Sequence, residues 1–237
     1  MSLLRASGCG ISGRLAPLDL DVGPGERVAV IGPNGAGKTS LLRALAAMEG
    51  AVGSVEIAGA RLTDLAPARR RKLLGYVPAA REAAWPIAVR DTVADGGASA
   101  DQVARWLGDL ELDALAGRPL NAISTGERAR AFLGRALAPA PPVVLADEPV
   151  ANLDPRWRLR VAELLGQAAR EGAAVLASLH DLDLALAWAS RVLVIENGVL
   201  LADATPEHLE SSGVIAVTFG VRRAGSGWIE GFSSPRP

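Results

Sequence analysis

The residues best suited to chemistry lie in one short stretch, GPNGAGKTS, at positions 32–40. It fits the pattern G-x-x-x-x-G-K-[ST], in which glycines let successive backbone N–H groups point towards an anion. In such a loop Lys38 reaches the β- and γ-phosphates of a nucleotide, and the Thr39 hydroxyl holds Mg²⁺. We therefore predict a phosphate-binding loop made of Gly32, Pro33, Asn34, Gly35, Ala36, Gly37, Lys38, Thr39 and Ser40.

The segments on either side of this loop are the ones that the motif requires. Residues 26–31 (ERVAVI) are apolar and β-branched, which predicts a buried strand. Residues 40–48 carry leucines and Met48 on one helical face, and the start of that helix adds about half a positive charge near the loop. The chain has only two lysines, Lys38 and Lys72, so a lysine stands where a compact ammonium suits a phosphate.

Two adjacent carboxylates, Asp147 and Glu148, follow the apolar run 143–146. That run predicts a strand buried on both faces, which is typical of a parallel sheet. Ligands of open α/β sheets lie at the carboxyl ends of the strands, so we expect both acids beside the phosphates. The next buried strand, 173–179, is placed next to it and leads to His180; a histidine there is ordinarily packed and hydrogen-bonded.

Composition sets the limits of the protein class. With 237 residues, 49% of them hydrophobic, the chain is long enough for one large α/β domain or for a domain with a subdomain. The formal net charge of −1 offers no bulk polycation to nucleic acid. A single cysteine, Cys9, excludes an internal disulfide framework. No run of about 18 apolar residues is present, so we expect any membrane role to come through a partner.

The remaining segments predict how the loop and the carboxylates are positioned. Residues 3–22 are interpreted as one or two short strands and residues 53–60 as a strand with a glycine turn, all in a small antiparallel layer. Residues 64–74 predict a helix, and its ARRRK run is either a solvated face or a contact to a membrane or partner. A short strand then ends at Pro78, and the β pattern stops between residues 79 and 121, which predicts a helical insertion.

Helix starts and turns continue the pattern towards the C-terminus. Ser124 and Glu127 have capping-box spacing, which marks the start of a helix within residues 122–138. Asp154 is placed to cap the next helix. A hairpin over 191–204 turns at Asn197-Gly198, a short helix begins at Pro206, and residues 233–237 are expected to be disordered.

Over about residues 18–209 the chain resembles the ATP-binding subunit of ABC transporters. VVLADE (143–148) is similar to the family's Walker B motif, which implies that Asp147 holds Mg²⁺ and Glu148 orients or deprotonates the attacking water. STGER (124–128) resembles the signature motif, although Ile123 and Thr125 replace its leucine and first glycine. ANLD (151–154) is similar to the D-loop, with Asp154 in it, and His180 stands where the family has its γ-phosphate sensor.

The resemblance implies an α/β fold: a P-loop NTPase core with a mostly parallel sheet, a small antiparallel β layer and an inserted helical subdomain. Residues 1–237 would form one ATP-binding domain. Its core spans about 1–78 and 139–210, the helical subdomain about 79–138, and the C-terminal tail about 211–237. Glu148, His180 and Lys38 would be the catalytic residues, and Thr39 and Asp147 would hold the metal. The motif Ser124, Thr125, Gly126 and Glu127 would act on the ATP of a partner subunit.

Two departures from the family pattern stand out. The family's Q-loop begins with glutamine after a strand such as GYVP, whereas this chain has Ala79 there, and alanine cannot ligate Mg²⁺. The family stacks adenine on an aromatic residue near the N-terminal strand, but residues 1–31 contain no Phe, Tyr, Trp or His. Loss of a base–aromatic stack worth ~1–3 kcal/mol weakens binding roughly ten-fold or more, which an aliphatic such as Ile11 or Leu15 could partly recover.

Segments 84–93, 179–198 and FGVR at 219–222 are similar to the ATPases of iron-siderophore, haem and vitamin B12 importers. The implied partners are transmembrane permease subunits, a head-to-tail dimer partner (itself or a related ATPase) and a separate substrate-binding protein, with no nucleic acid. The implied location is cytoplasmic, on the inner face of the membrane. Two alternatives stay open: a low-turnover nucleotide-binding regulatory module, and a soluble ABC ATPase that does not transport.

Overall fold

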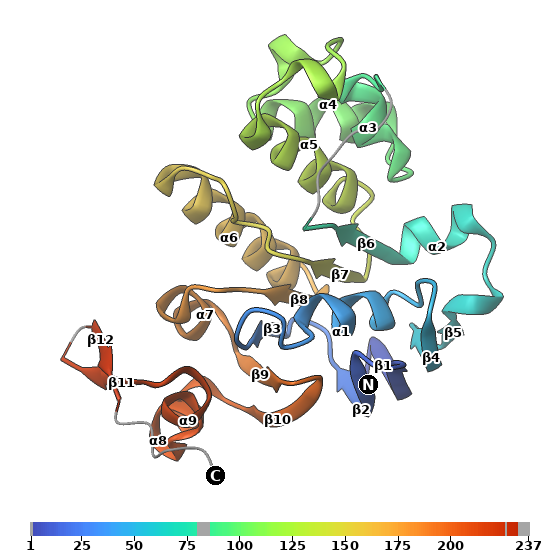
Figure 1. Cartoon of the computed structure of the whole chain (residues 1–237). Helices are drawn as coiled ribbons and strands as arrows, with labels where there is room; N and C mark the ends of the chain where they lie inside the picture. The colour runs from blue at the N-terminus through green and yellow to red at the C-terminus, as the bar shows by residue number, and fades with distance from the viewer. Residues whose placement is uncertain (1, 80–85, 226, 232–237) are drawn as a thin grey trace.

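The computed structural model describes residues 2–79, 86–225 and 227–231. The central sheet contains β3 (Arg27–Ile31), β6 (Leu74–Val77), β7 (Val143–Ala146), β8 (Ala174–Ser178), β9 (Arg191–Glu196) and β10 (Val199–Ala204). Their order is β10-β9-β3-β8-β7-β6, and all neighbours are parallel except β10 and β9 (Figure 1). The predicted parallel sheet is therefore confirmed, as is the position of β8 beside β7.

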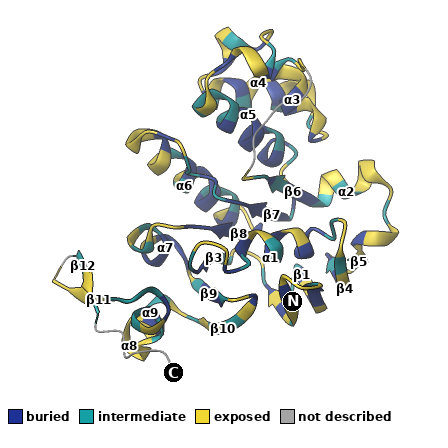
Figure 2. Ribbon diagram, in the orientation of Figure 1, coloured by how far each residue is buried: buried dark blue, intermediate teal, exposed yellow. Residues whose placement is uncertain are grey.

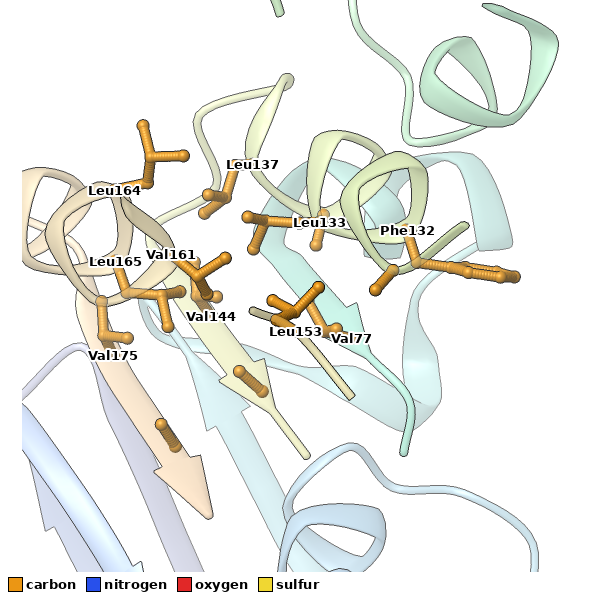
Figure 3. Close-up of a cluster of buried hydrophobic side chains, with 14 of the residues drawn as sticks. Val77, Phe132, Leu133, Leu137, Val144, Leu153, Val161, Leu164, Leu165 and Val175 are labelled. Carbon is orange, nitrogen blue, oxygen red and sulfur yellow. The ribbon is translucent and has the colours of Figure 1, made fainter. Parts of the chain in front are cut away.

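Each face of this sheet is covered by its own apolar cluster, because alternate residues of a strand point to opposite faces. On β3, Val28 and Val30 join one cluster, and Ala29 and Ile31 join the other. The first cluster contains α1 (Lys38–Leu45) and the antiparallel layer, and the second contains α5 (Thr125–Leu137), α6 (Pro155–Arg170) and α7 (Leu182–Trp188). Figure 3 shows α5 and α6 side chains meeting the sheet in the second cluster.

The antiparallel layer consists of β1 (Leu4–Ile11), β2 (Leu15–Val22), β4 (Ala51–Ile57) and β5 (Ala60–Arg61), in the order β2-β1-β4-β5. This confirms the predicted layer. The glycine turn expected within 53–60 is present as well: Ala58 and Gly59 have φ of 49° and 77°, so the chain turns there and β5 pairs back onto β4. The strand before this turn begins at Ala51, two residues earlier than expected.

The helical insertion contains α3 (Val89–Asp95), α4 (Ala100–Asp109), two short 3₁₀ helices (Asp113–Leu115 and Leu120–Ala122) and then α5. Within the described residues 86–121 the only β pairing is an isolated bridge between Ala88 and Pro119. Helices α3 and α4 stand apart from the sheet at the top of Figure 1, whereas α5 extends from them to β6. The insertion is thus helical as predicted, and α5 starts at Thr125 after the Ser124 cap, as the capping-box spacing predicts.

The basic segment before β6 is a shorter helix than the sequence predicts. Residues Leu62–Asp64 form a 3₁₀ turn, and α2 covers only Pro67–Leu73, because Pro67 sets the first helical position. None of its residues is buried, as Figure 2 shows. Its ARRRK run therefore lies on a solvent-exposed helix. Within this run Arg70 makes a structural contact, because its guanidinium donates to the carbonyl oxygens of Ala46 and Ala47 at the end of α1.

The tail holds more structure than its weak pattern suggests. After α8 (Pro206–Ser212), whose start at Pro206 is confirmed, come α9 (Val214–Phe219), β11 (Val221–Ala224) and β12 (Gly227–Glu230). Arg223 pairs with Asp183 of α7, and the Trp228 indole donates to the same carboxylate at 3.0 Å. These contacts attach the hairpin to α7. The expected disorder of 233–237 falls outside the described residues.

Candidate nucleotide-binding site

The loop between β3 and α1 has the geometry that a phosphate cradle needs. Gly35 and Gly37 have φ of 79° and 110°, a region that glycine adopts without strain. Gly37 caps α1 with no side-chain hydrogen bond, and the first turn of α1 carries no acidic residue. The first N–H groups of a helix have no intrahelical acceptors, so this end is open to an anion.

Lys38 is held inside the loop by backbone carbonyls. Its Nζ donates to Gly32 O at 2.7 Å and to Pro33 O at 3.0 Å, and the residue is only 6% exposed. Burial lowers the pKa of this ammonium below its usual range, although Glu148 and Asp147 act in the opposite direction. The loop therefore fixes a desolvated cation with its charge directed at the site.

Asp147 is buried at the carboxyl end of β7 with half of its carboxylate satisfied. Its Oδ1 accepts from Ser178 Oγ at 2.7 Å, whereas Oδ2 has no hydrogen-bond partner among the described residues. Ser178 Oγ also accepts from the Glu148 N–H at 2.8 Å, so one hydroxyl orients both acids. A buried carboxylate oxygen without a donor is suited to a hard divalent cation. Sequence reasoning placed Ser178 in a strand and missed this role.

Glu148 and His180 face each other across the ends of β7 and β8. His180 Nε2 lies 2.5 Å from Glu148 Oε1, and the two side chains are 44% and 31% exposed respectively. His180 is therefore not a packed core histidine. Glu148 has φ of 48°, a left-handed conformation that is uncommon for residues other than glycine.

Lys38, Glu148 and His180 line one cavity of about 450 Å³, whereas the buried Asp147 is not among its lining residues. It is lined by loop residues 34–40, by Glu148 and His180, and by two turns, Gly13-Arg14 and Asn197-Gly198. The structure thus brings together most of the predicted loop, including Lys38, with the other two predicted catalytic residues. Gly32 and Pro33 do not line the cavity, but their carbonyl oxygens accept from Lys38 Nζ. Neither turn was predicted to line the site; the only signal was the Asn-Gly pair, which indicates a hairpin.

The signature-like residues lie outside this cavity. Ser124 and Glu127 form a complete capping box: the Ser124 N–H donates to Glu127 Oε2 at 2.7 Å, and the Glu127 N–H donates to Ser124 Oγ at 3.3 Å. Thr125 and Gly126 occupy the first turn of α5. Asp154 caps α6 as predicted, accepting from the Trp157 N–H at 3.0 Å.

Both departures from the family pattern can be located. Ala79 is exposed just beyond β6 and does not line the cavity. Leu15 is 3% exposed and belongs to the core, and Ile11 does not line the cavity either. The structure therefore offers neither aliphatic residue to a base in this cavity.

Comparison with known proteins agrees with this site. The sequence pattern of the ABC transporter family matches residues 15–151. The hemin import ATP-binding protein HmuV of Streptomyces coelicolor is 38% identical over 85% of this chain and 76% of its own length. That of Nocardia farcinica is 41% identical over 89% and 77%. The chain therefore belongs to the ATP-binding proteins of the ABC transporter family.

Solved structures agree in fold. A structure described as the ATP-binding subunit of an ABC transporter superposes with a TM-score of 0.79 at 24% identity, over 92% of this chain and 96% of that one. A dimeric bacterial ABC transporter cassette gives a TM-score of 0.74 at 23% identity, over 86% and 98%. The fold is that of ABC ATPases, and the protein is an ABC-type ATPase.

Proposed function

We propose that this ATPase energises the import of hemin through separate membrane subunits. The observation that carries the substrate is the relationship to hemin import ATP-binding proteins, 41% identical in Nocardia farcinica and 38% in Streptomyces coelicolor across most of the chain. This choice narrows the three expected substrate classes, iron-siderophore, haem and vitamin B12, to one.

MgATP is the proposed ligand of the cavity. The N–H groups at the start of α1 and the ammonium of Lys38 would hold the phosphates. The unpaired Oδ2 of Asp147 and the Thr39 hydroxyl, which lines the cavity, fit Mg²⁺. When bound, that ion supplies charge neutralisation on the β- and γ-phosphates.

Glu148 is the proposed base for in-line attack of water on the γ-phosphate. It stands at the cavity wall, and its carboxylate is shared with His180, which would contact the γ-phosphate. Ser178 holds the Glu148 backbone in place, so the carboxylate is oriented before the nucleotide arrives. Lys38 and the loop N–H groups stabilise the charge that develops on the phosphoryl oxygens.

A head-to-tail dimer would complete the site. Ser124, Thr125, Gly126 and Glu127 do not reach the cavity of their own chain, so these residues would act on the nucleotide of a second subunit, with Asp154 near the same contact. Dimeric ABC cassettes of the same fold support this arrangement. Closure and reopening of the dimer would then drive a separate pair of permease subunits.

The partners proposed are transmembrane permease subunits and a substrate-binding protein, with the ATPase on the cytoplasmic face of the membrane. Among the described residues no helix is long and apolar enough to cross a bilayer. We propose no nucleic-acid partner, since the net charge is −1. The two alternatives, a low-turnover regulatory module and a soluble non-transport ATPase, both predict that no hemin uptake depends on Glu148.

The test is hemin uptake in bacteria that lack their own hemin-import ATPase but keep the membrane subunits. We expect the wild-type chain to restore uptake and Glu148→Gln to fail, although both proteins accumulate equally. Uptake of vitamin B12 and of iron-siderophores, measured in strains lacking those ATPases, serves as the substrate control. Restoration of one of those instead would overturn the hemin assignment, and equal uptake with Glu148→Gln would overturn the proposed role of hydrolysis.

A further inference from the structure

Two turns that are far apart in the sequence, Gly13-Arg14 and Asn197-Gly198, form part of the wall of the nucleotide cavity. The turn between β9 and β10 is bonded to the phosphate loop, because the Gly198 N–H donates to Ala36 O at 2.8 Å. The turn between β1 and β2 is bonded to it in turn, because the Ala16 N–H donates to Gly198 O at 2.7 Å. These backbone bonds place Arg14 at the cavity, next to the loop that would hold the phosphates.

Gly198 and Gly37 allow this close approach. A Cβ at Gly198 would lie 2.6 Å from the Arg14 carbonyl oxygen, which no real side chain tolerates, and one at Gly37 would lie 3.2 Å from the same atom. Both glycines also have positive φ, 74° and 110°. The backbone of Arg14 is therefore fixed against the loop, while its side chain is exposed.

Arg14 is a cation with no assigned task. Its guanidinium has no hydrogen bond or ion pair with any residue that the structure describes, whereas Arg5 is paired with Asp21 and Arg191 with Asp203. It lines a cavity in which no Phe, Tyr or Trp is found among the described residues. The one aromatic ring in that lining, the imidazole of His180, is hydrogen-bonded to Glu148, so the Arg14 guanidinium is the planar cation left for a base.

We propose that Arg14 binds the nucleobase of ATP by laying its guanidinium plane on the face of the ring. This inference rests on the proposed nucleotide site and deepens it. Guanidinium groups are planar, weakly hydrated and stack on π systems, which ammonium groups do not. The phosphates already have Lys38 and the N-terminus of α1, so the base is the part of the ligand that lacks a partner. Arg14 thus takes the role for which residues 1–31 offer no aromatic residue.

The experiment measures Kd by calorimetry for MgATP and for magnesium tripolyphosphate, which has phosphates but no base. We expect Arg14→Ala to weaken ATP about five- to tenfold and to leave tripolyphosphate unchanged. Arg14→Tyr restores ATP affinity, because a ring also stacks, and Arg14→Lys does not. Arg43→Ala removes an equal charge from the exposed side of α1, away from the cavity, and should change neither ligand.

Turnover gives an independent readout. A base contact is equal in the ground state and the transition state, so Arg14→Ala should raise KM for ATP by the same factor and leave kcat unchanged. If Arg14→Ala binds ATP like the wild type, the assignment is wrong. It is also wrong if tripolyphosphate weakens in parallel and Arg14→Lys restores both, since that marks a phosphate contact. Wild-type protein that binds neither ligand would overturn the nucleotide site itself, and the base contact with it.

Discussion

The N-termini of α1 and α5 carry the same helix-dipole charge, but only the N-terminus of α5 has a side-chain cap. α1 begins after Gly37 with no side-chain cap and no acid in its first turn. α5 begins after Ser124, whose hydroxyl and backbone N–H are both engaged with Glu127. Both ends carry the partial positive charge of a helix N-terminus, yet only the first leaves its N–H groups fully open.

This difference indicates two modes of anion binding. The α1 start, with Lys38 beneath it, is built to hold a phosphate within one chain. The α5 start is capped by its own residues, and it keeps the Ser124 hydroxyl proton and the N–H groups of Thr125 and Gly126 for a phosphate brought by another subunit. α4 provides an internal reference, because Ser99 and Gln102 form the same box without a proposed ligand.

The largest expected effect on nucleotide affinity comes from removing Lys38 at the uncapped start of α1. Lys38→Ala removes the buried ammonium, and we expect MgATP affinity to fall by roughly 100-fold or more, since charge-assisted hydrogen bonds contribute about 1.5–3 kcal/mol each. The matched control is Lys72→Ala, which removes the only other lysine, exposed on α2. Calorimetric titration with MgATP checks both. Equal loss in the two variants would refute the special role of Lys38.

The next effect separates binding from chemistry at the same site. Glu148→Gln keeps the shape of the side chain but removes the base, so turnover should fall about 10²–10⁴-fold while ATP affinity stays within a few fold. Steady-state phosphate release and a binding titration measure the two quantities. Glu49→Gln, an exposed carboxylate at a distance from the cavity, serves as the control. Turnover that survives in Glu148→Gln would show that another group activates the water.

The capping boxes of α4 and α5 allow a matched comparison between two N-cap serines. Ser124→Ala and Ser99→Ala each remove an N-cap, and each should lower the free energy of unfolding by about 1 kcal/mol. Only Ser124→Ala should also lower turnover, by roughly tenfold, because only that hydroxyl is proposed to meet the phosphate of a second subunit. Chemical denaturation and ATPase assays on both variants decide it. If turnover falls equally in both, Ser124 is a cap and nothing more.

Much of this site could be predicted from the sequence, because its main parts are local. The glycine loop, the carboxylates after β7 and the caps of α5 and α6 each depend on residues within a few positions of one another. The wall formed by Arg14 and Asn197-Gly198 could not be predicted, since it depends on hydrogen bonds between turns about 180 residues apart. Ser178 was missed for a related reason: its buried hydroxyl matters only because β8 lies beside β7.

The tail and α2 show the same limit on the scale of whole elements. The hairpin of β11 and β12 has little pattern of its own and is fixed by the contacts of Arg223 and Trp228 with Asp183. The start of α2 was expected three residues early, because Pro67 sets the first helical position. Sequence patterns therefore fail to predict the elements, or the element boundaries, that depend on distant contacts or on a single dihedral angle.

The smallest predicted effect is the pH dependence of the stability that the Ser124–Glu127 capping box gives to the start of α5. The Ser124 N–H donates to Glu127 and holds the pKa of that carboxyl below its ordinary value of 4.5. Because the folded-state pKa is depressed, the resulting stability is present above pH 4.5 and is lost as pH falls through the folded-state pKa. Glu127→Gln accepts the same hydrogen bond without titrating, so its Tm should fall less than that of the wild type between pH 5 and pH 3, by about 1–2 °C, since the group is well solvated.

The opposite substitution in the capping box of α4 tests whether this pH dependence comes from the carboxylate of the box. Gln102→Glu gives α4 the acidic form of the cap, and it should add a pH dependence of similar size over the same interval. Thermal unfolding at half-unit steps of pH measures all three proteins. If Glu127→Gln keeps the full acid sensitivity of the wild type while Gln102→Glu gains none, the carboxylate does not stabilise the cap. The self-closure of α5 would then come from the Ser124 hydroxyl alone, which would leave that helix start nearly as open to a phosphate as α1.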